Sequence, residues 1–255
     1  MSDNITIVIP ARMASSRYPG KPLVSILGLS LIEHVRRRAL LSTQSHLVVV
    51  ATCDIAIKEA VEQAGGKAIM TKDTHERCTD RIEEAMEQLP GDIVVMVQGD
   101  EPLLMPEAIE AVFAPLLADP TLPIVNLLSP LQSAEDYANP NIVKAVCKLN
   151  GDVVFFSRSS IPFFRQQVVV PVYRQTGIMA FRKHALTEFS NLSPTGLEKA
   201  ESVDMLRAIE HGMRIAGVVA DYPTIGVDRP GDVLLVEDAI RQDPVQQKLF
   251  QLISG

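Results

Sequence analysis

Apolar runs without a regular polar face dominate the first hundred residues. They are rich in Val and Ile and cover residues 5–10, 46–51, 67–70 and 92–97. Such runs are typical of parallel strands that are buried on both faces. The segments that follow them have apolar residues at helical spacing, and they cover residues 31–40, 55–64, 79–88 and 106–118. This alternation predicts an α/β fold with right-handed crossovers and a mostly parallel central sheet.

The second half of the chain has a less regular pattern. Apolar runs with few helical segments between them cover residues 123–128, 142–147, 153–156 and 168–172. This pattern favours an antiparallel lobe. A helix at 197–211, a strand at 214–219 and two helices after Pro230 complete the predicted elements. We predict a single domain over residues 1–255, with the smaller antiparallel lobe inserted at about 123–182.

Charge limits the classes of partner. The 255 residues include 31 Asp and Glu against 24 Lys and Arg, which gives a net charge of −7. A protein that binds the nucleic-acid backbone needs a broad basic face, and no basic block is present, so we expect no nucleic-acid partner. The triplet at 36–38 is interpreted as the solvated face of its helix. Small anionic ligands remain possible.

Cysteine usage and hydropathy indicate the compartment. Cys53, Cys78 and Cys147 are isolated, without a C-x-x-C pair or a histidine at metal-binding spacing, so neither disulfides nor zinc are expected. The amino terminus lacks the pattern of a signal peptide, and no apolar run approaches 18 residues. We therefore expect a cytoplasmic protein that does not span a membrane.

A loop rich in cations follows the first predicted strand. Residues 11–23 carry three cations among small residues: Arg12, Arg17 and Lys21 with Ser15, Ser16 and Gly20. The carboxyl ends of strands are where open α/β sheets bind ligands. A solvated basic loop is the alternative, but its position and the acidity of the remaining chain favour an anion site. The loop has neither the P-loop nor the G-x-G-x-x-G pattern.

Two acidic motifs lie far apart along the chain. Asp100, in V-Q-G-D-E-P at 97–102, follows a buried strand, and Asp228 precedes the helix expected after Pro230. A turn aspartate is the alternative for Asp100, and helix capping explains Asp232 but not Asp228. Two carboxylates beside a cationic loop fit a hard cation that shares phosphate oxygens, which points to nucleotidyl transfer.

These motifs resemble those of the CMP-Kdo synthetase (3-deoxy-manno-octulosonate cytidylyltransferase) family. The resemblance rests on P-A-R-M-A-S-S-R-Y-P-G-K-P-L at 10–23, V-Q-G-D-E-P at 97–102, N-P-N-I-V-K at 139–144, F-S-R-S-S-I-P at 156–162 and G-V-D-R-P at 226–230. It implies a Rossmann-like nucleotidyltransferase with an antiparallel dimerisation lobe. It further implies transfer of CMP from CTP to 3-deoxy-manno-octulosonate (Kdo) for lipopolysaccharide biosynthesis, with Mg²⁺, in a homodimer.

The resemblance also implies roles for individual residues. Nucleotide-binding positions would be Ala11, Arg12, Ser15, Arg17, Lys21 and Gln98. Magnesium ligands would be Asp100 and Asp228, and these two with Lys21 would form the catalytic set. The acceptor would be bound by Arg81 and Arg158, and we also expect Arg77, Gln175 and Asp204 at the acceptor.

Departures from the family pattern concentrate on the acceptor side. The family's H-x-S-G-T-E-R is H-E-R-C-T-D-R at 75–81, so Arg77 and Cys78 replace a small Ser-Gly pair. Its His and Tyr in R/K-H-L-G-I-Y-x-Y are replaced by Gln175 and Met179. The acceptor is therefore Kdo or, alternatively, a modified Kdo, another sugar acid or a phosphonate. An idle nucleotide-binding protein is the rival from another class. The role of His75 stays open, and Thr79 is expected at a helix N-cap that faces an anion.

Overall fold

The four parallel strands predicted for the first hundred residues are present in the computed structural model, which describes residues 4–15, 17–43, 47–166, 168–220 and 225–255. Its chain divides into two units, Met1–Glu110 with Pro223–Gly255, and Ala111–Tyr222. We describe each unit by itself. That the whole chain acts as one domain stays a prediction.

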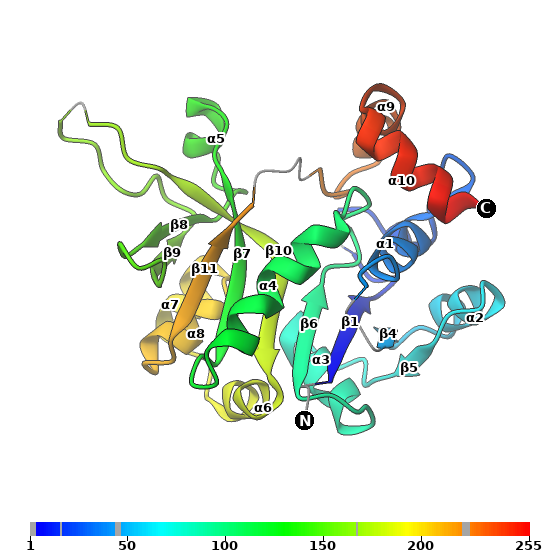
Figure 1. Ribbon diagram of the computed structural model, residues 1–255, viewed down its shortest axis with the longest axis horizontal. Coiled ribbons are helices and arrows are strands. Elements are labelled where there is room, and N and C mark those ends of the chain that lie inside the picture. Colours follow the sequence, from blue (N-terminus) through cyan, green and yellow to red (C-terminus); the bar gives the residue numbers. More distant parts are fainter. Residues whose placement is uncertain (1–3, 16, 44–46, 167, 221–224) are drawn as a thin grey trace. The chain divides into compact units, whose positions relative to one another are not determined.

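The first unit contains a parallel sheet formed by β1 (Ile5–Ala11), β4 (Leu47–Thr52), β5 (Ala68–Met70) and β6 (Ile93–Val97). β1 lies between β4 and β6, and β4 also pairs with β5 (Figure 1). Every residue of β1 and β6 is buried, which is why these strands read as unbroken apolar runs. His46, the first residue of one predicted strand, lies outside the described residues.

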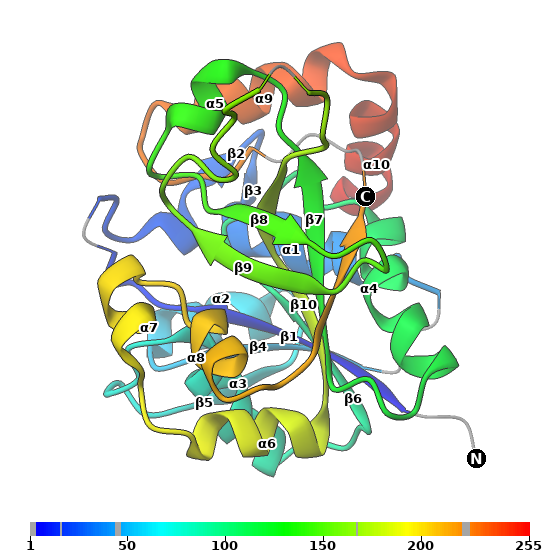
Figure 2. The same ribbon diagram turned by 90° about the vertical axis from the view of Figure 1, so that its left-hand side faces the viewer.

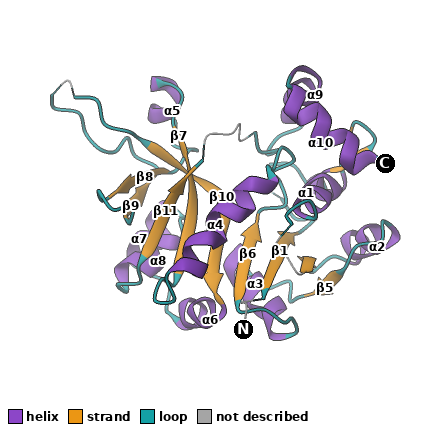
Figure 3. Ribbon diagram, viewed as in Figure 1, coloured by secondary structure: helices purple, strands orange, loops and turns teal. Residues whose placement is uncertain are grey.

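The crossover helices connect the strands and show where the strand order of this sheet reverses. They are α1 (Leu31–Ala39), α2 (Ile55–Gln63) and α3 (Cys78–Glu87), as the alternation in Figure 3 shows. From β1 the chain moves through β4 to β5, and then returns through α3 to β6 on the other side of β1. The carboxyl ends of β1 and β6 therefore form a topological switch point, where open α/β sheets bind their ligands.

The prediction of a solvated arginine face on α1 is wrong. Arg36 and Arg38 are only 5% and 0% exposed. Arg36 donates twice to Glu33, and Arg38 donates to the Leu104 carbonyl at 3.2 Å and to Gln246 Oε1 at 2.7 Å. Gln246 belongs to α10 (Pro244–Ser254), which follows α9 (Asp232–Gln242) and contacts α1. Helical periodicity within α1 cannot report this contact, because Gln246 lies 208 positions away in the sequence. Burial lowers the pKa of Arg38 to about 10.

The second unit contains a mixed, largely antiparallel sheet. Its strands are β7 (Ile124–Pro130), β8 (Lys144–Cys147), β9 (Val153–Ser157), β10 (Tyr173–Arg182) and β11 (Ile215–Val219). β10 pairs antiparallel with β7 and β8, β8 pairs antiparallel with β9, and β11 runs parallel to β7 (Figure 2). The antiparallel strands expected within residues 123–182 are confirmed.

Short helices join these strands: α5 (Ala134–Ala138), α6 (Lys183–Asn191), α7 (Gly196–Glu201) and α8 (Met205–Glu210). The helix α4 (Pro106–Ala118) begins in the first unit and ends in the second. Among the described residues, no helix has the length and apolar character needed to cross a bilayer.

Two predictions for the second unit are wrong. Residues 168–172 are not a strand. Val168, Val169 and Val170 precede β10 and are exposed, so their β-branched side chains do not pack into the core. The single helix predicted at 197–211 is two helices, because Ser202 adopts a left-handed backbone with φ 53°. Apolar periodicity continues across this break and therefore hides it.

A buried ion pair holds α7 and α8 together across that break. Arg207 donates to Glu198 through Nε at 2.8 Å and Nη2 at 2.6 Å, and both side chains are almost fully buried. Glu198 also accepts from the backbone of Thr195 in a capping box. The ion pair thus connects the two helices where the sequence predicts one continuous helix.

We expect Glu198→Ala to lower the free energy of unfolding by about 3 kcal/mol, because it leaves the Arg207 charge buried without its carboxylate. Urea unfolding measures this change. The control Glu210→Ala removes an exposed carboxylate at the end of α8 and should stay within about 0.5 kcal/mol of the unsubstituted chain. Equal stabilities for the two variants would contradict a structural role for the pair.

Candidate functional site

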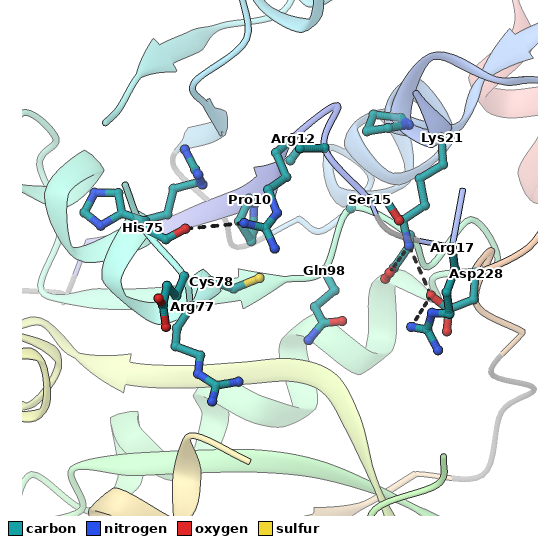
Figure 4. A pocket seen from close by; sticks show the side chains of 17 residues that line it. Pro10, Arg12, Ser15, Arg17, Lys21, His75, Arg77, Cys78, Gln98 and Asp228 are labelled. Atoms are coloured by element: carbon teal, nitrogen blue, oxygen red, sulfur yellow. Dashed lines mark hydrogen bonds and ion pairs between the residues drawn. The ribbon is translucent and has the colours of Figure 1, made fainter. Parts of the chain in front are cut away.

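A cavity of about 260 Å³ opens at the switch point of the first unit, close to the sizes typical of small-molecule sites (Figure 4). Its walls come from the loop after β1, the end of β6, the start of α3 and the segment before α9. All the predicted nucleotide and metal residues line it: Ala11, Arg12, Ser15, Arg17, Lys21, Gln98, Asp100 and Asp228. These residues therefore lie together in the structure, and their roles stay predictions.

The loop after β1 is folded back on itself around one carbonyl. Met13 O accepts from the backbone N–H groups of Ser15 and Gly20, each at 2.9 Å. Gly20 has φ 77°, a left-handed conformation that glycine adopts without strain. The backbone N–H of Met13 donates to Asp54 Oδ2 at 2.8 Å. Asp54, which follows β4, is a positioning residue that the sequence did not reveal, and Ser16 lies outside the described residues.

Lys21 is the centre of the site. Its ammonium donates to Asp100 Oδ2 at 2.7 Å, to the Val227 carbonyl at 2.9 Å and to Asp228 Oδ1 at 3.3 Å, as the dashed lines in Figure 4 show in part. Burial acts to lower the pKa of Lys21, but the two carboxylates outweigh it and raise that pKa above its ordinary value. Carboxylates 128 positions apart in the sequence therefore meet at one cation.

Backbone contacts fix Asp228 in this position. Val227 is fully buried, and its N–H donates to the Asp100 carbonyl at 2.9 Å. Asp232 Oδ2 accepts from the N–H groups of Asp228 and Arg229, both at 2.8 Å. Asp232 thus ties the segment to the first turn of α9 rather than only capping that helix. Pro230 precedes the helix, which begins at Asp232.

The two carboxylates fit a hard divalent cation. Mg²⁺ commonly takes one or two protein carboxylates and completes its octahedron with water and phosphate oxygens. Within the described ranges no cluster of three or more His, Cys, Asp and Glu side chains is arranged to hold a metal. Asp100 and Asp228 are therefore the donors offered here, at 25% and 44% side-chain exposure, and the rest would come from a ligand.

Close approach of β1 and β6 shapes the floor of the cavity. A Cβ atom on Gly99 would lie 2.9 Å from the Pro10 carbonyl, so a side chain there would separate the two strand ends. Gln98 is the last residue before this contact and lines the cavity. In the view of Figure 4 its amide lies between Cys78 and Asp228.

The start of α3 forms another wall. The prediction that Thr79 is the N-cap of this helix is wrong. Arg77 occupies the N-cap position, and Thr79 is completely buried. Arg81 is 3% exposed and donates to Thr71 Oγ1 and to the Lys72 carbonyl, while its Nη2 has no hydrogen-bond partner among the described residues. Arg77 and Arg81, both predicted at the acceptor, line the same cavity as Lys21.

A histidine and glutamate pair supports this wall. His75 Nε2 bonds to Glu84 Oε2, which also accepts from the Lys72 N–H at 3.0 Å. The His75 carbonyl in turn accepts from Arg12 Nη1 at 3.4 Å. Burial acts to raise the pKa of Glu84, but its bonds to His75 and Lys72 hold that pKa below its usual range. Sequence reasoning missed Glu84, since its link to His75 follows no helical spacing.

The other predicted acceptor residues belong to the second unit. Arg158 donates to the Glu201 carbonyl at 2.6 Å and to the Pro140 carbonyl at 3.1 Å. Gln175 donates to Asn126 Oδ1 at 2.8 Å, and Asp204 precedes α8. Their roles at the acceptor stay predictions.

Comparison with known proteins identifies the family. The family model described as Cytidylyltransferase matches residues 6–215, which include the loop after β1, Gln98 and Asp100. The chain belongs to the cytidylyltransferase family.

Similar proteins cover almost the whole of this cytidylyltransferase. The 3-deoxy-manno-octulosonate cytidylyltransferase of Pelobacter propionicus is 41% identical over 93% of this chain and 98% of its own length. That of Geobacter sulfurreducens is 39% identical over 93% of this chain and 100% of its own length. A solved structure of CMP:2-keto-3-deoxy-manno-octonic acid synthetase complexed with CTP has a TM-score of 0.89 and 39% identity, covering 94% and 99% of the two chains.

We expect the stability that Glu84 gives this cytidylyltransferase to depend on pH. Because its pKa is lower in the folded chain, its contribution is complete above the ordinary value of about 4.3 and is lost as pH falls through the lowered pKa. Glu84→Gln should cost about 1.5 kcal/mol at pH 7 and progressively less in acid. Urea unfolding across pH measures this difference, with the exposed Glu87→Gln as control. A cost that is constant with pH would contradict the assignment.

Proposed function

We propose that this cytidylyltransferase transfers CMP from CTP to Kdo, and that this step serves lipopolysaccharide biosynthesis. The anomeric hydroxyl oxygen of the acceptor would bond to the α-phosphorus and release its proton to water. The bond from that phosphorus to the bridging oxygen would break, and pyrophosphate would leave. The meeting of Lys21, Asp100 and Asp228 carries this proposal. The ammonium complements the negative charge of a triphosphate, and the two carboxylates complement the cation that a triphosphate binds. The names of relatives that cover nearly all of the chain support Kdo as the acceptor.

The cationic loop would bind the triphosphate. Arg12, Arg17 and Lys21 supply positive charge, and Ser15 adds a hydroxyl to the same cavity lining. Preorganised donors aimed at phosphate oxygens stabilise the charge that develops on the leaving pyrophosphate. Gln98 at the floor would seat the cytosine base, and Ala11 would contact the nucleotide through its backbone at the end of β1.

Asp100 and Asp228 would hold Mg²⁺. When bound, the ion would neutralise phosphate charge and orient the triphosphate for in-line attack. The protein keeps both carboxylates in position through Val227 and Asp232, as described above.

Arg81 would bind the acceptor's acidic group. Its Nη2 is buried in the cavity wall without a hydrogen-bond partner among the described residues, and a carboxylate is the acceptor that a guanidinium best satisfies. Arg77 adds a second cation at that wall, with Arg158, Gln175 and Asp204 as further proposed contacts. The presence of Arg77 beside Cys78 favours a second candidate, the same chemistry on a modified Kdo, another sugar acid or a phosphonate.

Pyrophosphate release separates these candidates. With CTP and Mg²⁺ we expect rapid release on addition of Kdo, and much slower release with other sugar acids or phosphonates at the same concentration. A site built around polar contacts to one substrate discriminates by about 10⁴-fold against analogues that lack them. Release with another acid but not with Kdo would overturn the acceptor assignment, and CTP binding without release on any acid would indicate an idle nucleotide-binding protein.

The proposal includes a homodimer in the cytoplasm, where CTP is available. Large apolar side chains are exposed on one stretch of the second unit: Phe163, Phe164, Val168, Val169 and Val170. Exposed apolar groups in such number favour burial against another chain, and a second copy is the commonest partner.

We expect sedimentation equilibrium to give twice the chain mass of 27.9 kDa. The double variant Phe163→Lys/Val169→Lys should sediment as a monomer, because charge cannot be buried in an apolar interface. Leu252→Lys, at an exposed position of α10, should remain dimeric. A measured mass equal to that of one unsubstituted chain would refute the dimer.

A further inference from the structure

The ammonium of Lys21 has no donor left over. A lysine carries three N–H donors, and three acceptors lie within reach: Asp100 Oδ2 at 2.7 Å, the Val227 carbonyl at 2.9 Å and Asp228 Oδ1 at 3.3 Å. The side chain is only 14% exposed, so water contributes little. Two donors of the residue proposed to bind phosphate are therefore engaged by the two residues proposed to bind the metal, and the third is engaged by the Val227 carbonyl.

Lys21 contacts one oxygen of each carboxylate, Asp100 Oδ2 and Asp228 Oδ1, and a divalent ion bound between the two side chains would compete with the ammonium for this position. Positive charges a few ångströms apart repel strongly where solvent is partly excluded. Conversely, Asp100 and Asp228 without a cation between them would repel each other. Lys21 therefore stabilises the carboxylate pair in the free protein and at the same time blocks it.

We propose that Lys21 holds the place of the metal ion until a nucleotide arrives, so that this cytidylyltransferase binds its divalent ion together with CTP and only weakly before it. This inference rests on the function proposed above. The triphosphate would draw the ammonium away from Asp100 and Asp228, and their freed oxygens would then accept the ion. The flexible four-carbon stem of lysine allows this movement. Among the described residues, the uncharged partner that the ammonium would give up is the Val227 carbonyl.

Arg17 adds to the same coupling. Its Nη2 donates to Asp228 Oδ1 at 2.9 Å, the oxygen that Lys21 also contacts. Two of the three cations of the loop, Arg17 and Lys21, thus contact the carboxylates proposed to bind the metal. Since linkage is reciprocal, any factor by which the nucleotide strengthens metal binding must equal the factor by which metal strengthens nucleotide binding.

Direct binding of Mn²⁺, followed by loss of its free EPR signal, tests the inference without catalysis. We expect the unsubstituted chain to bind Mn²⁺ weakly without nucleotide and Lys21→Met to bind it about tenfold more tightly or better, within the usual range of coupling between sites. Lys58→Met, which removes an exposed lysine of α2, is the matched control and should change nothing. Lys21→Met/Asp100→Asn should lose the gain, which would assign the added affinity to this site.

Addition of CTP separates failure of the inference from failure of the proposed function. With CTP, after correction for Mn²⁺ bound by CTP alone, we expect the unsubstituted chain to bind Mn²⁺ tightly and Lys21→Met to gain little more. Tight Mn²⁺ binding by the unsubstituted chain before any nucleotide, equal to that of Lys21→Met, would overturn the inference and leave the function standing. No binding by the unsubstituted chain under either condition would overturn the proposed metal site itself. Lys21→Gln provides a second neutral variant should Lys21→Met fail to fold.

Discussion

The contact of one ammonium with two carboxylates organises the candidate site. Lys21 belongs to the loop after β1, Asp100 to the end of β6 and Asp228 to the segment before α9. Strand pairing brings the ends of β1 and β6 together, and the buried Val227 packs the third segment beside them. The ammonium then lets two acids lie close together that would repel each other alone. The Val227 contacts with Asp100 and Lys21 strengthen the same junction.

Electrostatic design explains why an acidic chain can bind a polyanion. The chain has a net charge of −7, yet cations outnumber acids in the lining of one cavity. Its cations are Arg12, Arg17, Lys21, Arg77 and Arg81, and its acids are Glu76, Asp100 and Asp228. Glu84 supports that cationic wall from behind, through His75 and the Lys72 N–H, without presenting its own charge to the cavity lining. Local charge, and not the sum over the chain, decides which ligand the site accepts.

Sequence predicts the parts of this structure that depend on neighbours along the chain or on burial of whole strands. The sequence predicted the strand β6 because both of its faces are buried. Since open α/β sheets bind ligands at the carboxyl ends of their strands, it also predicted that Gln98 and Asp100 lie near the loop of Lys21. The features that were missed depend on partners that no local pattern reports. Arg38 is buried by a helix from the far end of the chain, and Glu84 acts through a contact with His75.

Backbone detail was the other limit. The break at Ser202 leaves helical periodicity intact, and the apolar run at 168–172 has the composition of a strand but no core to enter. Asp232 was readable as a cap, yet its bonds to the Asp228 and Arg229 N–H groups make it a support for a proposed metal ligand. Such roles follow from the direction of single hydrogen bonds, which composition does not encode.

Anomalous diffraction from a crystal grown with CTP and Mn²⁺ tests the central claim most directly. The account predicts one strong manganese peak in contact with carboxylate oxygens of both Asp100 and Asp228 and with phosphate oxygens of the nucleotide, with the Lys21 ammonium moved onto the triphosphate. A manganese peak away from these two carboxylates, or Lys21 still bound between them with the nucleotide in place, would contradict it.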